Sequence, residues 1–529
     1  MKRLDKLSMQ LTAGQIGRRE FMMGALALGA SLSSASTMAN QALAASPKQG
    51  GRFRIGLGHG STTDNFDPAT VENDFTIMGT WVFRGHLTEV DENDKLTGDL
   101  AESWDVSDDA RTWVFKLRDG VEFHNGKTLD ANDVVASINH HRGEDSKSAA
   151  KPIVASVEDI KATGKNEMTV VLDAGNADFP FIVSDYHLAI MPADSEGKID
   201  WSNHIGTGGY VLEDWDPGIR ASFKRNPNFY KSGRAHFDEV EMLVIADVVA
   251  RTNALTTGEL DLMDRCDIKT VHLLARNPNV KVEETSGTAH YTMPMLVDTA
   301  PFDNNDLRLA IKHACDREAM VKTILRGHGV VGNDHPIGRS NPYFAEGLAQ
   351  RSYDIDKAKH HLKKAGYDSI DLNLSASDAA FPGAVDAAIL LKEHAAPAGI
   401  NINVVREPAD GYWSDVWIKK PWAQSYWSGR PTEDWMFATA YAAGAAWNET
   451  RFDHDRFEKL MLEGRSELDP EKRRQIYFEM QKIVSDQGGN LIPMFNNYVF
   501  ATNAKVQHGS MSAAWAQDGQ KAPERWWFG

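Results

Sequence analysis

Strand-type and helix-type patterns alternate along the chain after residue 44, and this alternation restricts the fold more than any other feature. In residues 112–118, large apolar side chains at Trp113, Phe115 and Leu117 alternate with polar ones, as in a half-buried strand. Helical spacing follows over residues 130–140, and the pair Asp469-Pro470 predicts a capped helix start. Interleaved strands and helices predict an α/β fold.

A further helix is predicted between Asp303, a capping residue type, and about Leu325. Its apolar side chains recur at helical spacing, and Gly327 is placed to end it. We expect one continuous helix over this segment. The apolar positions are Leu307, Ile311, Ala314, Val321 and Leu325.

The chain is too long for a single hydrophobic core. Without the first 44 residues, 485 remain, so two or three domains are expected. No repeat, low-complexity tract or long flexible linker interrupts this part of the sequence. The domains are therefore expected to be joined by short crossings of the chain.

The first 44 residues have the layout of an export signal. Basic residues precede a mildly apolar stretch at positions 22–30, and Ala42-Leu43-Ala44 forms a small-x-small cleavage site. The pair Arg18-Arg19 favours the Tat route. A membrane anchor is the alternative, but Gly, Ser and Thr interrupt the apolar run below the ~20 residues that spanning requires. We expect a periplasmic protein cleaved near Ala44, without a lipid anchor because the leader contains no cysteine.

Charge and cysteine content restrict the partners. The leader holds five basic and two acidic residues, so its removal takes the net charge from −17 to about −20. Such an acidic surface argues against nucleic acid as a partner. Cys266 and Cys315 form either a disulfide or two buried thiols, and the sequence leaves both possibilities open.

Nine segments, in order and spread over nearly the whole mature chain, together resemble one family: the large periplasmic solute-binding proteins for peptides, nickel complexes and related solutes (family 5, oligopeptide/dipeptide type). The segments are 64–68 (DNFDP), 100–104 (LAESW), 115–126 (FKLRDGVEFHNG), 129–134 (LDANDV), 206–210 (GTGGY), 225–230 (RNPNFY), 251–261 (ending in TGELD), 301–317 (from PFD to DR) and 353–367.

The resemblance implies a two-lobed periplasmic-binding-protein fold of type II, with an extra subdomain inserted in lobe one. Lobe one would comprise residues 46–292 plus 497–529, with the insert at about 90–210, and lobe two residues 293–496. It also implies a monomer that binds its ligand in the cleft between the lobes, closes over it, and delivers it to an ABC transporter permease in the inner membrane. No cofactor and no catalytic activity are expected.

Motifs for catalysis or metal binding are weak. Residues 123–128 end like a phosphate loop, but Val121 stands where the first glycine is needed. The pairs His140-His141 and His360-His361, and His454 between two aspartates, lack zinc-type spacing and are interpreted as solvated faces. No Gly-x-Ser-x-Gly elbow is present. The adjacent carboxyl groups at 433 and 434 suggest a glycosidase only faintly, because neighbours in sequence rarely face each other across a substrate.

Residues 412–435 contain five of the 14 tryptophans: Trp413, Trp417, Trp422, Trp427 and Trp435. They are either core residues of lobe two or a stacking wall in the cleft, since each ring buries a large area and offers an N–H group. Trp413 and Trp417 are one helical turn apart, so one helix face would present both.

Residues 427–435 resemble the loop in which dipeptide-type relatives carry an acidic residue that binds the α-ammonium group of the ligand. Arg430 stands at that position here. A guanidinium pairs with a carboxylate and repels an ammonium, so the resemblance favours a ligand with an anionic group. The alternative is that Arg430 pairs with Glu433 or Asp434 and is structural.

We therefore predict a receptor for a small organic solute, peptide-like or amino-acid-derived and bearing a carboxylate. A receptor for a nickel or haem complex and a periplasmic hydrolase on the same scaffold are the alternatives. On the opposite lobe, the loop around Thr63 and the helix with Trp81 and Arg84 lie where relatives line the cleft. The predicted ligand-binding residues are Arg430, Trp427, Trp435, Asp434, Trp413, Trp417, Thr63 and Trp81.

Overall fold

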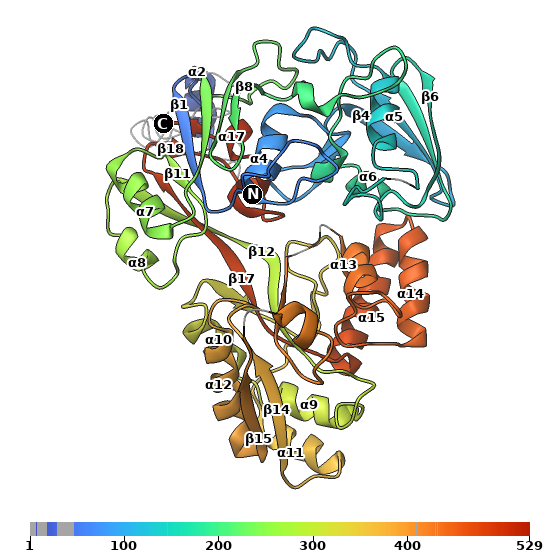
Figure 1. Ribbon diagram of the computed structural model, residues 1–529, viewed down its shortest axis with the longest axis vertical. Coiled ribbons are helices and arrows are strands. Elements are labelled where there is room, and N and C mark those ends of the chain that lie inside the picture. Colours follow the sequence, from blue (N-terminus) through green and yellow to red (C-terminus); the bar gives the residue numbers. More distant parts are fainter. Residues whose placement is uncertain are drawn as a thin grey trace.

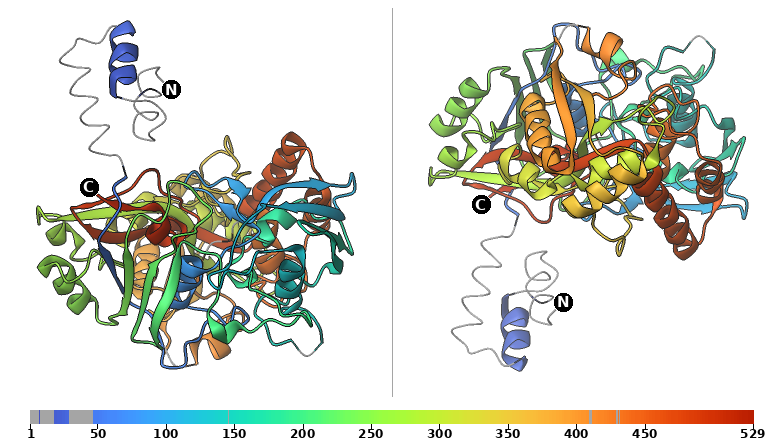
Figure 2. Two further views of the ribbon diagram at one scale, coloured as in Figure 1. Left: turned by 90° about the horizontal axis from the view of Figure 1, so that it is seen from above. Right: turned by 90° about the horizontal axis from the view of Figure 1, so that it is seen from below.

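The computed structural model describes residue 7 and residues 18–28, 47–144, 146–408, 411–428, 430 and 432–529. Of the predicted leader it describes one helix, α2 (Arg18–Ala27), which lies apart from the folded body in Figure 2. The predicted cleavage site at Ala44 lies outside the described residues. In Figure 1 the body has a wide part at the top and a narrow part below, and two long strands run from one into the other.

A nine-stranded sheet organises the wide part. Its central strand β1 (Arg52–Leu57) runs parallel to both neighbours, and the side chains of Phe53, Ile55 and Leu57 are buried in the core on one face. The strands lie in the order β16 (Ser425–Trp427), β12 (Val280–Pro294), β17 (Asn490–Asn503), β11 (Leu262–Met263), β1, β10 (Glu239–Val244), β9 (Arg220–Arg225) and β8 (Tyr210–Asp216), with β13 (Gly329–Val331) paired to β17.

Helix α4 (Asp74–Phe83) packs against this sheet and is buried along nine of its ten residues. It begins where the Asn73 side chain accepts the N–H groups of Phe75 and Thr76, a standard N-cap. The remaining elements around the sheet are α7 (Val248–Thr257), α8 (Val271–Leu274), α16 (Ala516–Gly519), α17 (Ala522–Arg525), β18 (Val506–Gln507) and β19 (Trp527–Phe528).

A separate four-stranded antiparallel sheet extends the wide part, with its own hydrophobic cluster. The predicted strand is confirmed as β5 (Thr112–Leu117), and the predicted helix as α5 (Ala131–Asn139), which Asp130 caps. The other elements here are β2 (Thr88–Val90), β3 (Leu96–Gly98), β4 (Ala101–Val106), β6 (Val157–Gly164), β7 (Glu167–Leu172), α6 (Phe179–Ile182) and the 3₁₀ turns η1 (Tyr186–Leu188) and η2 (Trp201–Asn203).

The two parts are connected by β12 and β17, which pair antiparallel over most of their length and pass from the wide part into the narrow part (Figure 1). Their register shifts between Ser286 and His290, so three residues of β12 bulge out of the ladder. The two parts are therefore joined by a hydrogen-bonded pair of strands, whose ladder is locally irregular.

The narrow part contains a parallel strand pair flanked by helices, and a layer of three helices. The prediction of one helix from Asp303 to Leu325 is wrong. Two helices form, α9 (Asn305–His313) and α10 (Arg317–Thr323), because Asp316 accepts the N–H of Ala319 and starts a new helix. The flanking elements are α11 (Ile355–Lys364), β14 (Ile370–Ala376), α12 (Ala384–Ala395), η3 (Ala396–Ala398) and β15 (Ile400–Arg406).

The three-helix layer consists of α13 (Glu433–Ala440), α14 (Asp455–Ser466) and α15 (Pro470–Gln487), preceded by the π-helical turn η4 (Tyr412–Val416). The predicted Asp469-Pro470 start is confirmed: the Asp469 side chain accepts the N–H groups of the first helical turn. This layer packs around its own hydrophobic cluster, distinct from the core beneath β14 and β15.

The two cysteines are free and buried in different clusters, Cys266 beneath α7 and Cys315 beneath α9, so the thiol alternative holds. The interpretation of the histidines as solvated faces is wrong for His141, which is fully buried and bonds to Ser148. His454 is partly exposed and caps α14. In the described part of the chain, no helix combines the length and the apolarity needed to cross a bilayer.

Candidate ligand-binding site

Two neighbouring hollows lie between elements that are far apart in the sequence. The free space between the walls, including the part open to solvent, is about 450 Å³ in the first and about 320 Å³ in the second, and Val90 and Ala514 line both. The first is lined by Trp81, Val90, Ser184, Asp185, Tyr186, Ser512, Ala514, Trp515, Gly519 and Lys521. The second is lined by Val90, Asp94, Phe181, Thr288, Ser340, Asn341, Pro342, Arg430 and Ala514. The second hollow thus lies between the wide and the narrow parts.

The C-terminal segment reaches this place because a side chain of the β2–β3 turn holds it. Asp94 Oδ1 accepts hydrogen bonds from Ser512 Oγ (2.7 Å) and from the N–H groups of Ala513 (2.8 Å) and Ala514 (3.2 Å). One carboxylate therefore fixes the loop that carries Trp515 into the wall of the first hollow.

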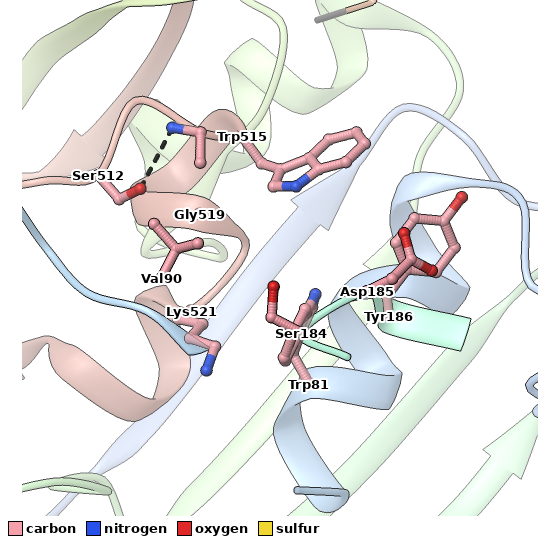
Figure 3. A pocket seen from close by; sticks show the side chains of 10 residues that line it. Trp81, Val90, Ser184, Asp185, Tyr186, Ser512, Trp515, Gly519 and Lys521 are labelled. Atoms are coloured by element: carbon pink, nitrogen blue, oxygen red, sulfur yellow. Dashed lines mark hydrogen bonds between the residues drawn. The ribbon is translucent and has the colours of Figure 1, made fainter. Parts of the chain in front are cut away.

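Three aromatic side chains bound the first hollow: Trp81, Tyr186 and Trp515 (Figure 3). Tyr186 and Trp515 meet edge to face with ring centroids 5.9 Å apart. The ring of Trp81 is covered by Lys521, whose Nζ lies 4.4 Å from its centroid, and by His86 at 4.0 Å. Trp515 and Tyr186 therefore offer ring surface to a solute, whereas Trp81 presents its edge.

The indole nitrogen at that edge is buried and has no hydrogen-bond partner among the described residues. In Figure 3 it points toward the space bounded by Ser184, Trp515 and Tyr186. A buried N–H group is costly to leave unpaired, so this donor is suited to an acceptor atom supplied by a ligand.

Buried charges lie directly behind the first hollow. Lys521 pairs with Glu89, and Lys231 bridges Glu89 (3.1 Å), Asp99 (2.8 Å) and Glu524 (3.3 Å). These cations hold the pKa of Glu89 well below its usual range against the opposing effect of burial. The network is satisfied internally, which keeps Lys521 in place over Trp81.

Asp185 is the acidic group of the wall. Its Oδ1 bonds the N–H (3.0 Å) and the Nδ1 (2.6 Å) of His187, and the side chain is largely buried. Its charge also acts on Arg430 of the narrow part. The carboxylate in the wall of the first hollow and the guanidinium in the wall of the second are therefore near enough to interact.

Arg430 lines the second hollow. Its guanidinium donates to the carbonyl oxygen of Ser428 (2.9 Å) and lies 5.8 Å from the ring centroid of Trp427. Burial lowers the pKa of Arg430, although a guanidinium remains charged in a protein. Trp427 itself is buried in the cluster of α13 to α15.

The two carboxyl groups that the sequence offered as alternative partners of Arg430 bond elsewhere. Asp434 pairs with Arg465 at 3.0 Å, and Glu433 accepts the backbone N–H of Tyr343 at 2.6 Å. Burial raises the pKa of both carboxyl groups, that of Glu433 to about 7. Ligand contact by Asp434 stays a prediction, and neither hollow includes it among its lining residues.

Trp413 and Trp417 lie together, with ring centroids 5.6 Å apart, but not on an α-helix: η4 is a single π-helical turn. Trp413 is 41% exposed and also contacts Tyr426 at 5.7 Å. Trp417 donates its indole N–H to the buried carboxylate of Glu449 at 2.9 Å. These rings form an exposed aromatic surface outside both hollows.

Trp435 is half-buried in the first turn of α13, and Thr63 is exposed in a turn where its hydroxyl bonds Ser61 Oγ at 2.8 Å. Neither is among the residues that line the hollows. Trp422 is core, and Arg84 is fully buried with its guanidinium on the carbonyl oxygens of Phe66 and Trp201. Ligand contacts of Trp413, Trp417, Trp435 and Thr63 therefore remain predictions.

Sequence reasoning missed the residues that complete the walls, chiefly Asp185, Tyr186, Trp515 and Lys521. No local motif marks them, because Asp185 and Tyr186 come from one short turn and Trp515 and Lys521 from the C-terminal segment, and the two meet only in the folded chain. Among the described residues, no cluster of three or more His, Cys, Asp or Glu side chains is arranged to hold a metal ion.

Two separately packed parts with a hollow at their junction are typical of one class of protein, the two-lobed solute-binding proteins. A model of the bacterial extracellular solute-binding proteins, family 5 (middle region), matches residues 95–449, more than half of the chain. The chain belongs to this family, as its sequence resemblance predicted.

Similar proteins agree with this assignment. The probable D,D-dipeptide-binding periplasmic protein DdpA of Escherichia coli (strain K12) is 25% identical over 473 residues, covering 85% of this chain and 90% of that protein. Heme-binding protein A of Haemophilus influenzae is 25% identical over 460 residues, covering 79% and 82%. The solved structure of HbpA2 from Haemophilus parasuis has a TM-score of 0.81 at 18% identity, covering 90% of this chain and all of that one. The predicted α/β two-lobed fold is confirmed.

Proposed function

We propose that this chain is the periplasmic solute receptor of an ABC importer and acts as a monomer without catalysing a reaction. Lobe one would comprise residues 46–292 and 497–529, with an inserted subdomain at about 90–210, and lobe two residues 293–496. Export would follow the Tat route with cleavage near Ala44. The family assignment and the periplasmic name of a relative support this proposal.

The observation that carries the proposal is the opposition of charge across the hollows. Arg430 of the narrow part lines the second hollow, and Asp185 of the wide part lines the first, beside the rings of Tyr186 and Trp515; the two charges are near enough to interact. A small organic solute with a carboxylate would pair with the guanidinium, and a cationic group on the same solute would suit Asp185. The two rings would cover its apolar portion.

The energetics of such a site are sufficient for a receptor. Micromolar affinity requires about −8 kcal/mol. A charge-assisted hydrogen bond contributes about 1.5–3 kcal/mol, and burial of a solute against two aromatic rings adds to this at about 25 cal/mol per Å². Closure of the lobes over the solute would exclude water and strengthen the ion pair.

A thermal-shift screen over D-alanyl-D-alanine, glutathione, opine-like amino-acid conjugates, dicarboxylic acids and haemin tests this function. A bound solute raises the melting temperature, because it stabilises the folded protein by a free energy that grows with the logarithm of its concentration over Kd. Arg430→Gln is expected to weaken the solute found by about 1.5–3 kcal/mol, or roughly 10- to 100-fold in Kd, because it removes a buried charge-assisted contact.

The matched control is Arg456→Gln, since Arg456 pairs with Glu479 on the exposed surface of α14 and α15. It should leave the affinity unchanged. Full affinity in the Arg430→Gln protein would refute the charge pairing, and conversion of the solute to a product, detected by mass spectrometry, would refute the non-catalytic assignment.

Haem is a second candidate because one relative is named a heme-binding protein. The described residues that line the two hollows include no histidine, cysteine or methionine, so this chain would hold haem through its propionates and its ring surface rather than by an axial ligand. The absorption spectrum of a haemin complex distinguishes the two modes of binding.

A further inference from the structure

The wide and narrow parts meet at a second place, away from the crossing strands. There α6 of the wide part lies against α14 and α15 of the narrow part (Figure 1). The N–H of Ala177 donates to the carbonyl oxygen of Arg465 at 2.7 Å, and Arg473 Nη1 donates to Asp178 Oδ1 at 2.8 Å. Phe179 and Tyr477, beside these contacts, belong to different hydrophobic clusters. The contact therefore joins two separately packed bodies.

Asp178 serves this contact rather than its own helix. It occupies the N-cap of α6, where an aspartate ordinarily accepts a hydrogen bond from the first helical turn, but its side chain makes no such bond. The carboxylate instead pairs with Arg473, and both side chains are only 5% exposed. Its second oxygen has no hydrogen-bond partner among the described residues. The position of Asp178 thus depends on the opposite part.

Around this pair, buried acidic groups outnumber buried basic ones. The carboxyl groups of Asp178, Glu433 and Asp434 lie near two guanidiniums, those of Arg465 and Arg473. Tyr343 and Tyr477 lie beside them, and Arg474 is exposed. Arg465 pairs with Asp434, and Arg473 also bonds the carbonyl oxygen of Gly464 (3.0 Å) and the hydroxyl of Tyr477 (3.2 Å). The titratable and charged groups near one another come from both parts. They are Asp178 at the N-cap of α6, Tyr343 from the segment between β13 and α11, Glu433 and Asp434 from α13, Arg465 from α14, and Arg473, Arg474 and Tyr477 from α15.

The sign of the pH dependence follows from this excess. Burial raises the pKa of Glu433 from 4.5 to about 7, so the carboxyl group is neutral in the closed contact below neutrality. Above pH 7 it becomes a third buried negative charge beside two guanidiniums. The carboxylate of Asp178, in the wide part, is one of the groups that raise this pKa, so separation of the two parts removes its repulsion and lowers the pKa of Glu433 toward the ordinary value. The joined state therefore binds more protons, and rising pH between about 4.5 and 7 favours separation.

We propose that Asp178, Glu433, Asp434, Arg465 and Arg473 form a proton-sensitive clasp that holds the two parts together in acid and loosens as the pH rises. The proposal rests on the proposed function only in treating the two parts as lobes that move. The clasp requires no particular solute. A failed solute screen would therefore not refute the clasp, and a failed test of the clasp would not refute the solute site.

The separation of the two parts can be measured without a solute. Spin labels at Leu462→Cys on α14 (63% exposed) and Lys161→Cys on β6 (61% exposed) report their distance. The native cysteines will not react, because burial raises the pKa of both Cys266 and Cys315 to about 12. Between about pH 5 and pH 7 the joined-to-separated ratio is expected to fall by up to about tenfold per pH unit, with a distance change of more than about 2 Å.

Two variants decide the mechanism. Glu433→Gln keeps the shape and removes the titrating group, so its distance distribution is expected to be independent of pH and joined. Asp178→Asn, which leaves Arg473 unpaired, is expected to be separated at every pH. Glu479→Gln breaks the exposed Arg456 pair within the narrow part and should behave as the unmodified protein.

A distribution that is the same at pH 5 and pH 8, or a Glu433→Gln protein that keeps the pH response, overturns the proposal. Thermal unfolding of each variant establishes that it is folded. If Asp178→Asn does not fold, the Glu433→Gln variant alone still tests the proposal. The Glu433→Gln substitution changes neither the charge of the joined state in acid nor the size of the side chain.

Discussion

At the scale of single residues, Trp81 says most about how a solute would be held. Lys521 and His86 pack against its ring, while its indole N–H is buried at the wall of the first hollow without a partner among the described residues. Trp81 therefore contributes a single directed donor. Such a donor discriminates between solutes, because one without an acceptor at that point leaves the N–H unpaired.

Trp81→Phe is expected to weaken solute binding by about 1 kcal/mol, or roughly fivefold in Kd, because it removes the donor and keeps most of the ring. Isothermal titration with the solute found by the screen measures this. The matched control is Trp527→Phe, whose indole N–H is likewise buried without a partner among the described residues but lies in β19, outside both hollows. Equal affinities of the two variants would contradict the assignment.

The sequence predicted some of the wall residues and not others, for a physical reason. Arg430 stands out because it reverses a charge in a recognisable loop, and Trp81 because it follows a recognisable segment; the structure places both against the hollows. Asp185 and Trp515 carry no such mark. Their neighbours in space, such as Asp94 holding residues 512–514, are several hundred positions away, and no local pattern encodes that distance.

At the scale of elements, the crossing of β12 and β17 depends on a close approach at Gly287. A Cβ atom there would lie 2.3 Å from the ring of Tyr498 and 3.0 Å from the carbonyl oxygen of Ala513. The bulge in β12 between Ser286 and His290 surrounds this glycine. The segment that connects the two parts is therefore packed too tightly to accept even a methyl group.

Gly287→Ala is expected to lower the free energy of unfolding by about 1–3 kcal/mol through overpacking. Differential scanning calorimetry measures the change. Gly509→Ala is the matched control, because nothing lies within 4 Å of a Cβ at that position, and it should shift stability by less than about 0.5 kcal/mol. A Gly287→Ala protein as stable as the control would show that Tyr498 moves aside without cost.

Helix starts marked by a capping residue were predictable from the sequence, but the break between α9 and α10 was not predicted. Asp130 and the Asp469-Pro470 pair set helix starts by bonding N–H groups in the next turn, so the sequence alone locates them. The periodicity between Asp303 and Leu325 concealed a break, because residues on both sides of it face the same core. A second capping residue, Asp316, was the available signal.

At the scale of the whole molecule, the hollows lie between two connections of different kinds. The crossing strands form a covalent and hydrogen-bonded joint, and the clasp of Asp178 and Arg473 forms an ionic one. Separation at the clasp would expose the second hollow while the strands stay paired. Interfaces between domains are polar where they open and close, and this contact has that character.

Small-angle X-ray scattering of the mature protein, with and without the solute found by the screen, tests the central claim most directly. Closure over a solute between two lobes predicts that the radius of gyration falls on saturation, that Arg430→Gln requires a higher solute concentration for the same fall, and that the solute is recovered unchanged. A radius that is identical with and without a bound solute, or the appearance of a product, would contradict a receptor that closes on its cargo.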